Sequence, residues 1–391
     1  MRGFLKGLGG LVILAALLWL GLWLYADMRL KQLVTARIDA VNQSGEAQIA
    51  YDKIATSRSP LMASVTLTNP RWTARPDPST PPITISAASI GAHIDLAHPL
   101  TLHVDMPLSI GVTSSAASGA VTFAMAEMTE TLSPAVWLGH AATPITGGEA
   151  RFAGIDLLAS HGSLAVAQIG ALSLNETLNA KANTSQTALS FDANLHDLRL
   201  SPILTKLANL PFGGRVAHLG LSARLSGPLD WQGIAQREAT LGDEDQRHQF
   251  MLETLHRWAL AGGRGEGKIS LTLGPSVFNA DGTVAFDKNA QPSGESSLTA
   301  DHLDQFTAAL TASYPDAQDW VSKIEAELSP YLSTTQDGGQ VLTMNTSYGK
   351  QGIVVNGKKT GDLPPLDWDK LINPPPAPPV APGDGSGAAS P

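Results

Sequence analysis

The sequence has no cysteine among its 391 residues, and basic residues are few. Without cysteine, the chain forms no disulfide, no thiolate zinc site and no cysteine nucleophile. Its 26 Lys and Arg stand against 35 Asp and Glu, which gives a formal net charge of −9 at pH 7. Proteins that bind a phosphate backbone need a basic face. We therefore predict that nucleic acid is not a partner.

Motifs for catalysis are also lacking. His248 and His256 share a predicted helix but are eight residues apart, whereas a zinc-protease helix places its histidines four apart. The glycines of "GGRGEG" at residues 262–267 follow that helix, whereas a phosphate-binding loop follows a strand. They predict the end of a helix. The Gly-x-Ser-x-Gly turn of serine hydrolases does not occur. We predict a non-enzymatic protein with no cofactor and no metal.

The most distinctive segment that is present is an uncharged stretch over residues 7–26. A helix of this length rises about 30 Å and crosses the hydrocarbon core of a bilayer. A cleaved signal would be shorter and would end in small residues, but Leu24 and Tyr25 precede Ala26. A soluble core helix would contain polar residues. Aromatic rings near the end favour the headgroup region. We predict a membrane anchor that includes Leu11, Ile13, Leu18, Trp19, Trp23 and Tyr25.

Basic residues flank the predicted anchor on both sides. Arg2 and Lys6 precede it, and Arg29, Lys31 and Arg37 follow it, so the positive-inside rule is nearly balanced. A very short N-terminus before a large domain usually stays in the cytoplasm, and long domains translocate largely regardless of charge. We therefore expect a single pass, with residues 1–26 as stub and anchor and the bulk of the chain outside the cytoplasm.

Residues 27–45 have the apolar spacing of an amphipathic helix. Leu30, Leu33, Val34 and Ile38 recur at helical intervals, and Gly45 is a natural end. We predict a stalk that continues the anchor. It either lies on a surface or partner, or packs against its own domain, and the second interpretation is favoured.

Alternation of apolar and polar residues predicts strands in the two blocks that follow, residues 46–210 and 211–370. Leu61, Ala63, Val65 and Leu67 are typical of the first block. The links between strands are too short for repeated helical crossovers, so the pairing should be antiparallel. We predict an α+β fold, mainly antiparallel β, with large twisted or curved sheets and a few flanking amphipathic helices.

Helices interrupt the second block. We predict one over residues 245–261, one over 301–313 capped by Asp301, and one from Pro315 onward. Asp281-Gly282 is a common hairpin turn, but unbroken alternation favours one long strand over residues 278–286. Residues 374–391 hold seven prolines and are predicted to be disordered. The first helix should bury Phe250, Met251, Leu255, Trp258 and Ala259, and the third should bury Trp320, Ile324 and Leu328.

Three features carry a resemblance to a known family. They are the anchor, the closing "LPPL" at 363–366, and residues 257–306, "RWALAGGRGEGKISLTLGPSVFNADGTVAFDKNAQPSGESSLTADHLDQF". The chain resembles an uncharacterised family of single-pass, membrane-anchored envelope proteins of Gram-negative bacteria, known as a domain of unknown function. That family is distantly similar to AsmA-type proteins. The resemblance implies an inner-membrane location with a periplasmic bulk, and the AsmA-type comparison implies a curved sheet with an apolar groove for lipid. The Pro-rich loop at 71–82 does not match.

The leading hypothesis is a non-enzymatic, membrane-anchored periplasmic protein that binds lipid or another apolar ligand in a concave β-sheet. The alternative is an envelope assembly scaffold for a protein partner. The predicted partners are therefore the inner membrane, through the N-terminal helix, and a lipid or an envelope protein. The resemblance rests on turns and strand edges, so it assigns no catalytic, cofactor-binding or metal-binding residue.

Overall fold

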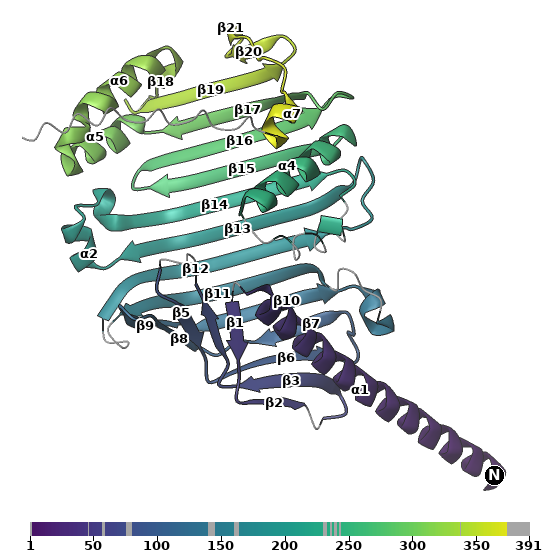
Figure 1. Ribbon diagram of the computed structural model, residues 1–391. Coiled ribbons are helices and arrows are strands. Elements are labelled where there is room, and N and C mark those ends of the chain that lie inside the picture. The colour runs from purple at the N-terminus through teal and green to yellow at the C-terminus, as the bar shows by residue number, and fades with distance from the viewer. Residues whose placement is uncertain are drawn as a thin grey trace, which may run out of the picture.

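A computed structural model describes residues 2–45, 47–56, 59–75, 80–139, 145–159, 164–229, 233–234, 237, 241, 244–336 and 338–373. For residues 2–16 and Ser44 it describes the backbone alone. Figure 1 shows one long sheet, with the N-terminal helix crossing one end of it and shorter helices near the other end. All strand pairs in these ranges are antiparallel. The predicted fold class, α+β with mainly antiparallel strands, is confirmed.

The N-terminal end of the sheet divides into two branches, which we call the first and second wings. The first wing pairs, from its outer edge inward, β2 (Lys53–Thr56), β3 (Met62–Thr68), β6 (Ser89–Asp95), β7 (Thr101–Asp105) and β10 (Met125–Leu132). The second wing pairs, in the same sense, β1 (Ala47–Ala50), β4 (Arg71–Ala74), β5 (Ile83–Ser86), β8 (Ser109–Thr113) and β9 (Ser118–Thr122).

The two wings join on a single long strand, β11 (Ile145–Ala159). Its first part pairs with β10 of the first wing, and its last four residues pair with β9 of the second. Gly154 lies between these parts with a φ of +57°, and a Cβ there would lie 2.7 Å from the Cβ of Ala124. Both facts require glycine at this position. The change of partner along β11 therefore opens a space between the wings.

Beyond β11 the sheet continues as a series of long strands. The two predicted blocks meet within it, because β13 and β14 pair along almost their whole length. β16 runs unbroken through Asp281-Gly282, so the prediction of one long strand is confirmed. The remaining strands are β12 (Leu164–Leu178), β13 (Thr187–Leu200), β14 (Arg215–Ser226), β15 (Arg264–Leu273), β16 (Ser276–Phe286), β17 (Pro292–Asp301), β18 (Leu332–Thr334), β19 (Gln340–Gly349), β20 (Gly352–Val355) and β21 (Lys358–Gly361).

Short helices lie near the ends of these strands (Figure 1). The α-helices are α2 (Pro202–Leu207), α4 (Glu244–Leu260), α5 (Leu303–Ser313), α6 (Gln318–Leu328) and α7 (Trp368–Ile372). The 3₁₀ turns are η1 (Pro134–Leu138), η2 (Pro211–Gly214), η3 (Pro315–Ala317) and η4 (Ser329–Tyr331). α4 ends before Gly262, whose φ is +77°, as predicted. Residues 374–391, predicted to be disordered, lie outside the described residues.

Trp258 of α4 is a core residue, as predicted. It is 5% exposed, its indole N–H donates to the Ser226 carbonyl at 3.0 Å, and its ring meets Phe286 edge-on. A Cβ on Gly263 would lie 2.4 Å from the Trp258 ring. Gly263, the second of the two glycines after the helix, therefore makes room for the indole.

Other predictions of buried faces were wrong, because each short helix covers only part of the sheet. Met251 and Leu255 of α4 are exposed, as are Trp320 and Ile324 of α6. Val321 is the buried residue of α6 instead. Asp301 does not cap α5, because it still belongs to β17 and His302 takes the cap position. The predicted loop at 71–82 begins with strand β4.

Helix α1 (Arg2–Ser44) is continuous from the predicted anchor through the predicted stalk. Leu30 and Ile38 are buried, which confirms that the stalk packs against its own domain. The N-terminal part projects beyond the edge of the sheet (Figure 1). Among the residues whose side chains are described, which begin at Leu17, neither α1 nor any other helix has a segment that is long and apolar enough to span a membrane.

Candidate functional site

An apolar cavity of about 650 Å³ lies between helix α1 and the two wings; we call it the interwing cavity. Its walls come from α1, from both wings and from the start of β11, so segments far apart in the sequence meet around it. The apolar residues that line it are Leu30, Leu33, Val34, Ile38, Ile49, Leu67, Pro70, Trp72, Ile85, Ala87, Ile90, Leu102, Ile110, Leu132 and Ile145. The volume is within the range of about 300–1,000 Å³ that is usual for small-molecule sites.

Helix α1 is fixed to both wings, so it forms a permanent wall of the cavity. Ala26 and Leu30 belong to a buried cluster with Ala63, Val65 and Ile94 of the first wing. Further along, the Asn42 amide accepts from the Ile49 N–H at 2.6 Å and donates to the Ile49 carbonyl at 3.1 Å. These two bonds complete the edge of β1 in the second wing. The helix thus spans the opening between the wings.

Three charged residues lie at the cavity. Arg37 of α1 and Arg71 of β4 are exposed at its boundary, and Glu130 of β10 is half-buried within it. Burial raises the pKa of the Glu130 carboxyl, and the negative charge of Glu176 raises it further, while the positive charge of Arg37 opposes the shift. Gly148 separates the two glutamates in the sheet register, which leaves the space between them without a side chain. The cavity therefore joins a large apolar wall to a small ionisable region.

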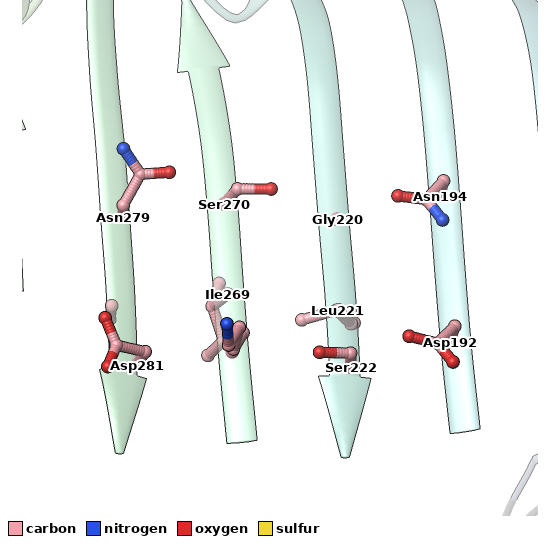
Figure 2. Close-up of a pocket in the computed structure, with 11 residues that line it drawn as sticks. Asp192, Asn194, Gly220, Leu221, Ser222, Ile269, Ser270, Asn279 and Asp281 are labelled. Carbon is pink, nitrogen blue, oxygen red and sulfur yellow. The ribbon is translucent and has the colours of Figure 1, made fainter. Parts of the chain in front are cut away.

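A second hollow, of about 370 Å³, lies on the sheet across β13 to β16. Figure 2 shows Asp192, Asn194, Ser270, Asn279 and Asp281 arranged across adjacent strands around it. Gly220 forms part of its floor, and a Cβ there would lie 2.5 Å from the Ser270 hydroxyl oxygen. Its lining, all of it in the described part of the chain, includes no aromatic ring that a sugar or base would stack on. This hollow is less suited than the interwing cavity to hold a ligand.

Histidines form two cross-strand pairs away from the cavity. His93 and His103 stack with ring centroids 4.9 Å apart, and His196 and His218 approach with their Nδ1 atoms 3.3 Å apart. Across the described ranges, no three histidine, aspartate or glutamate side chains are placed to share a metal ion. His256 stacks on Trp368 with ring centroids 4.7 Å apart, because α7 folds against α4.

The predicted anchor residues have different positions. The side chains of Leu11 and Ile13 lie outside the described residues. Leu18 is 67% exposed, whereas Trp23 is partly buried against the first wing. Trp19 and Tyr25 are exposed but bond to the domain, Trp19 to the Pro60 carbonyl and Tyr25 to the Trp137 carbonyl. The aromatic residues at the end of the predicted anchor thus contact the protein.

Sequence reasoning missed the cavity and its charged residues. One signal for Glu130 is visible in β10, where Met128, Glu130 and Leu132 occupy alternate positions on one face. A carboxylate between two apolar residues of an inward-facing row predicts a buried charge. Nothing in the sequence places Arg37 or Arg71 beside it, because both positions depend on how the wings and α1 meet.

The fold and cavity define a class of protein: an open antiparallel sheet whose N-terminal end forms two wings around an apolar cavity, closed on one side by a long helix. The chain belongs to the DUF2125 family, described as an uncharacterised protein conserved in bacteria, whose model matches residues 23–345. A comparison with curated proteins finds no match. Membership in a bacterial family of unknown function, which the sequence predicted, is confirmed.

Proposed function

We propose that this protein is a non-enzymatic, membrane-anchored envelope protein that holds a lipid acyl chain in the interwing cavity. The observation that carries the proposal is the cavity itself. Its size suits a small ligand, and fifteen of the nineteen residues that line it are apolar or aromatic. Burying a ligand of that character is favourable by about 25 cal/mol per Å² of apolar area removed from water.

The boundary of the cavity supports an amphiphile rather than a hydrocarbon. Arg37 and Arg71 offer guanidinium groups that suit a phosphate or carboxylate head. Glu130, which also lines the cavity, accepts a proton more readily than an ordinary carboxyl group. An acyl chain in the apolar part and an anionic head near the two arginines would satisfy both regions.

The proposal assigns residues 1–26 to the inner membrane and the bulk of the chain to the periplasm. The uncharged segment over residues 7–26 supports this arrangement. The same helix then continues as the wall of the cavity from Leu30 to Ile38. A lipid that leaves the bilayer would therefore meet the cavity directly beside the helix that anchors it.

A pair of adjacent alanines allows a matched test. Ala87 lines the cavity, whereas Ala88 is exposed and does not. The full-length protein is purified in detergent, its lipids are extracted and measured by mass spectrometry, and uptake of a fluorescent fatty-acid probe is titrated. We expect Ala87→Phe to reduce both bound lipid and probe uptake several-fold, because the ring occupies the cavity, and Ala88→Phe to leave both unchanged.

Two results would contradict the proposal. The first is wild-type protein that carries no lipid and takes up no probe. The second is equal binding by the two alanine variants, which would place the lipid elsewhere, for example on the open face of the sheet. Melting temperatures of both variants should match the wild type and thereby exclude misfolding as the cause.

The alternative, a scaffold for a protein partner, is supported by a different observation. Leu221, Ile269 and Leu298 are 40%, 52% and 37% exposed, and they follow one register row across β14, β15 and β17. Exposed apolar surface of this kind often marks an interaction site. Proximity labelling in the envelope that recovers one protein partner with wild type and loses it with Ile269→Ser would favour the scaffold.

A further inference from the structure

The turns around the exit of helix α1 hold this helix by four side-chain bonds. The indole N–H groups of Trp19 and Trp23 donate to the carbonyls of Pro60 and Met62 at 2.7 and 3.2 Å. On the other side of α1, Tyr25 donates to the carbonyl of Trp137, and Arg29 donates to the carbonyl of Val136 at 2.9 Å. The turn before β3 and the 3₁₀ turn η1 are therefore fixed at the level of residues 19–29 of the helix.

These two turns expose apolar side chains beside an apolar helix. Leu61 and Leu138 are 68% and 74% exposed. In the segment of α1 that bonds to these turns, Leu18, Leu22 and Leu24 are 67%, 51% and 55% exposed. Leu61 and Leu138 directly follow the residues whose carbonyl groups bind Trp19 and Tyr25. They therefore lie beside the same segment of α1, residues 19–25. A set of large apolar side chains gathered in one region of a surface marks a site of interaction.

The same turns carry no formal charge in the residues that the structure describes. The described parts are residues 59–61, 97–100 and 133–139, and none of them is Asp, Glu, Lys or Arg. The segment 97–100 joins the other two because the Trp137 indole donates to the Pro99 carbonyl at 3.0 Å. Charged residues make up 16% of the chain. We call the described residues of these turns, 59–61, 97–100 and 133–139, the collar.

We propose that the collar rests in the headgroup region of the bilayer that holds the anchor; this rests on the membrane part of the proposed function. The uncharged segment ends at Ala26, and Asp27 turns inward, where it accepts from the Ser64 N–H at 3.2 Å. Residues 19–25 thus form the last turns of the apolar segment, where aromatic rings favour the membrane interface. The turns that are hydrogen-bonded to these residues would therefore lie at the same depth in the bilayer.

The collar would place the cavity close to the membrane. Leu30 is the first α1 residue that lines the cavity, five residues beyond Tyr25. At about 1.5 Å per residue, this separation is about 8 Å along the helix. A domain seated on the collar therefore presents its apolar cavity just above the headgroups, with the continuous helix α1 as the connection.

The absence of cysteine makes a site-specific test clean. Leu61→Cys and Leu138→Cys receive an environment-sensitive fluorophore, and Leu207→Cys is the control, because Leu207 is 83% exposed on α2, away from the wings. Each labelled full-length protein is reconstituted in vesicles of phosphatidylethanolamine and phosphatidylglycerol. We expect blue-shifted emission at positions 61 and 138 and quenching by lipids with a nitroxide near the top of the acyl chain, several-fold stronger than at position 207.

Two results would overturn the inference and are distinguishable. Labels at 61 and 138 that behave like the label at 207, in protein that resists alkaline carbonate extraction, would leave the anchor intact and refute the collar. Protein that carbonate releases from the vesicles would refute anchor and collar together. Neither result depends on lipid in the interwing cavity, which the Ala87→Phe comparison measures separately.

Discussion

The N-terminal end and the middle of the sheet show the same alternation of apolar and polar residues, but only the first is covered by a helix. In the first wing, Ala63, Val65 and Ile94 are at most 2% exposed, because α1 packs across them. In the middle of the sheet, Leu221 and Ile269 occupy equivalent apolar positions of their strands but are 40% and 52% exposed. The pattern of a strand determines which face is apolar, and the cover on that face determines whether a core forms.

This difference also locates function within the molecule. The covered end has the packing that gives a stable wall and a cavity, whereas the open middle is a single layer with side chains accessible on both faces. A single layer gains little stability from its apolar face, since much of that face still meets water. Large exposed apolar residues there are accordingly better explained by a ligand or partner than by folding.

The largest expected effect is at Trp258, where α4 packs against the ends of β14 and β16. Trp258→Ala should lower the free energy of unfolding by about 3–5 kcal/mol, as large-to-small core substitutions do. The indole is 5% exposed and also loses its bond to Ser226. Trp320→Ala is the control, because Trp320 is 48% exposed on α6. Urea unfolding in detergent compares them, and equal losses would show that α4 is not a true cover.

A matched pair of leucines compares the covered and open regions directly. Leu30→Ala should cost about 2–5 kcal/mol, since Leu30 is 1% exposed and a cavity would remain. Leu221→Ala should cost less than about 1 kcal/mol, which is the span of strand propensity when little burial is lost. The same unfolding measurement tests both. A loss at Leu221 as large as at Leu30 would mean that something covers the middle of the sheet in solution.

Much of this fold could be predicted from periodicity. Period-two alternation predicted the antiparallel strands, including the unbroken β16, and the glycines at 262–263 predicted the end of α4. The errors have one physical origin. Met251, Leu255, Trp320 and Ile324 are apolar at helical spacing but exposed, because only a narrow side of each helix, with Phe250 and Trp258 in α4 and Val321 in α6, is buried. An apolar helix face can be recognised from the sequence, but whether another part of the chain packs on it depends on segments that are distant in the sequence.

The candidate site was less predictable. The cavity depends on the change of partner along β11 and on the passage of α1 between the wings, and neither is a local property. Trp19 and Trp23 were assigned to the membrane interface, but they also bond to backbone carbonyls of the domain. A domain that begins at Asp27 would therefore lack three hydrogen bonds, those of Trp19, Trp23 and Tyr25, and the buried Ala26.

The smallest expected effect compares two faces of one strand. Glu130 faces the interwing cavity, and Glu127 of the same strand is exposed. Burial and Glu176 raise the pKa of Glu130 above its usual value of 4.5 in the folded protein. A raised folded-state pKa means that the folded protein binds this proton more tightly than the unfolded chain. The stability that this provides is fully present below about pH 4.5 and is lost as the pH rises through the folded-state pKa.

Glutamine resembles the protonated form at every pH, so Glu130→Gln should melt like the wild type in acid and above it near neutral pH. The difference should develop from the usual carboxyl pKa upward, and thermal unfolding at a series of pH values measures it. Glu127→Gln is the control for the substitution itself, because Glu127 is exposed on the same strand, and it should leave the melting temperature nearly unchanged. If Glu130→Gln instead melts below the wild type at neutral pH, attraction to Arg37 outweighs burial, and the cavity holds a stabilising ion pair rather than an ionisable group kept from water.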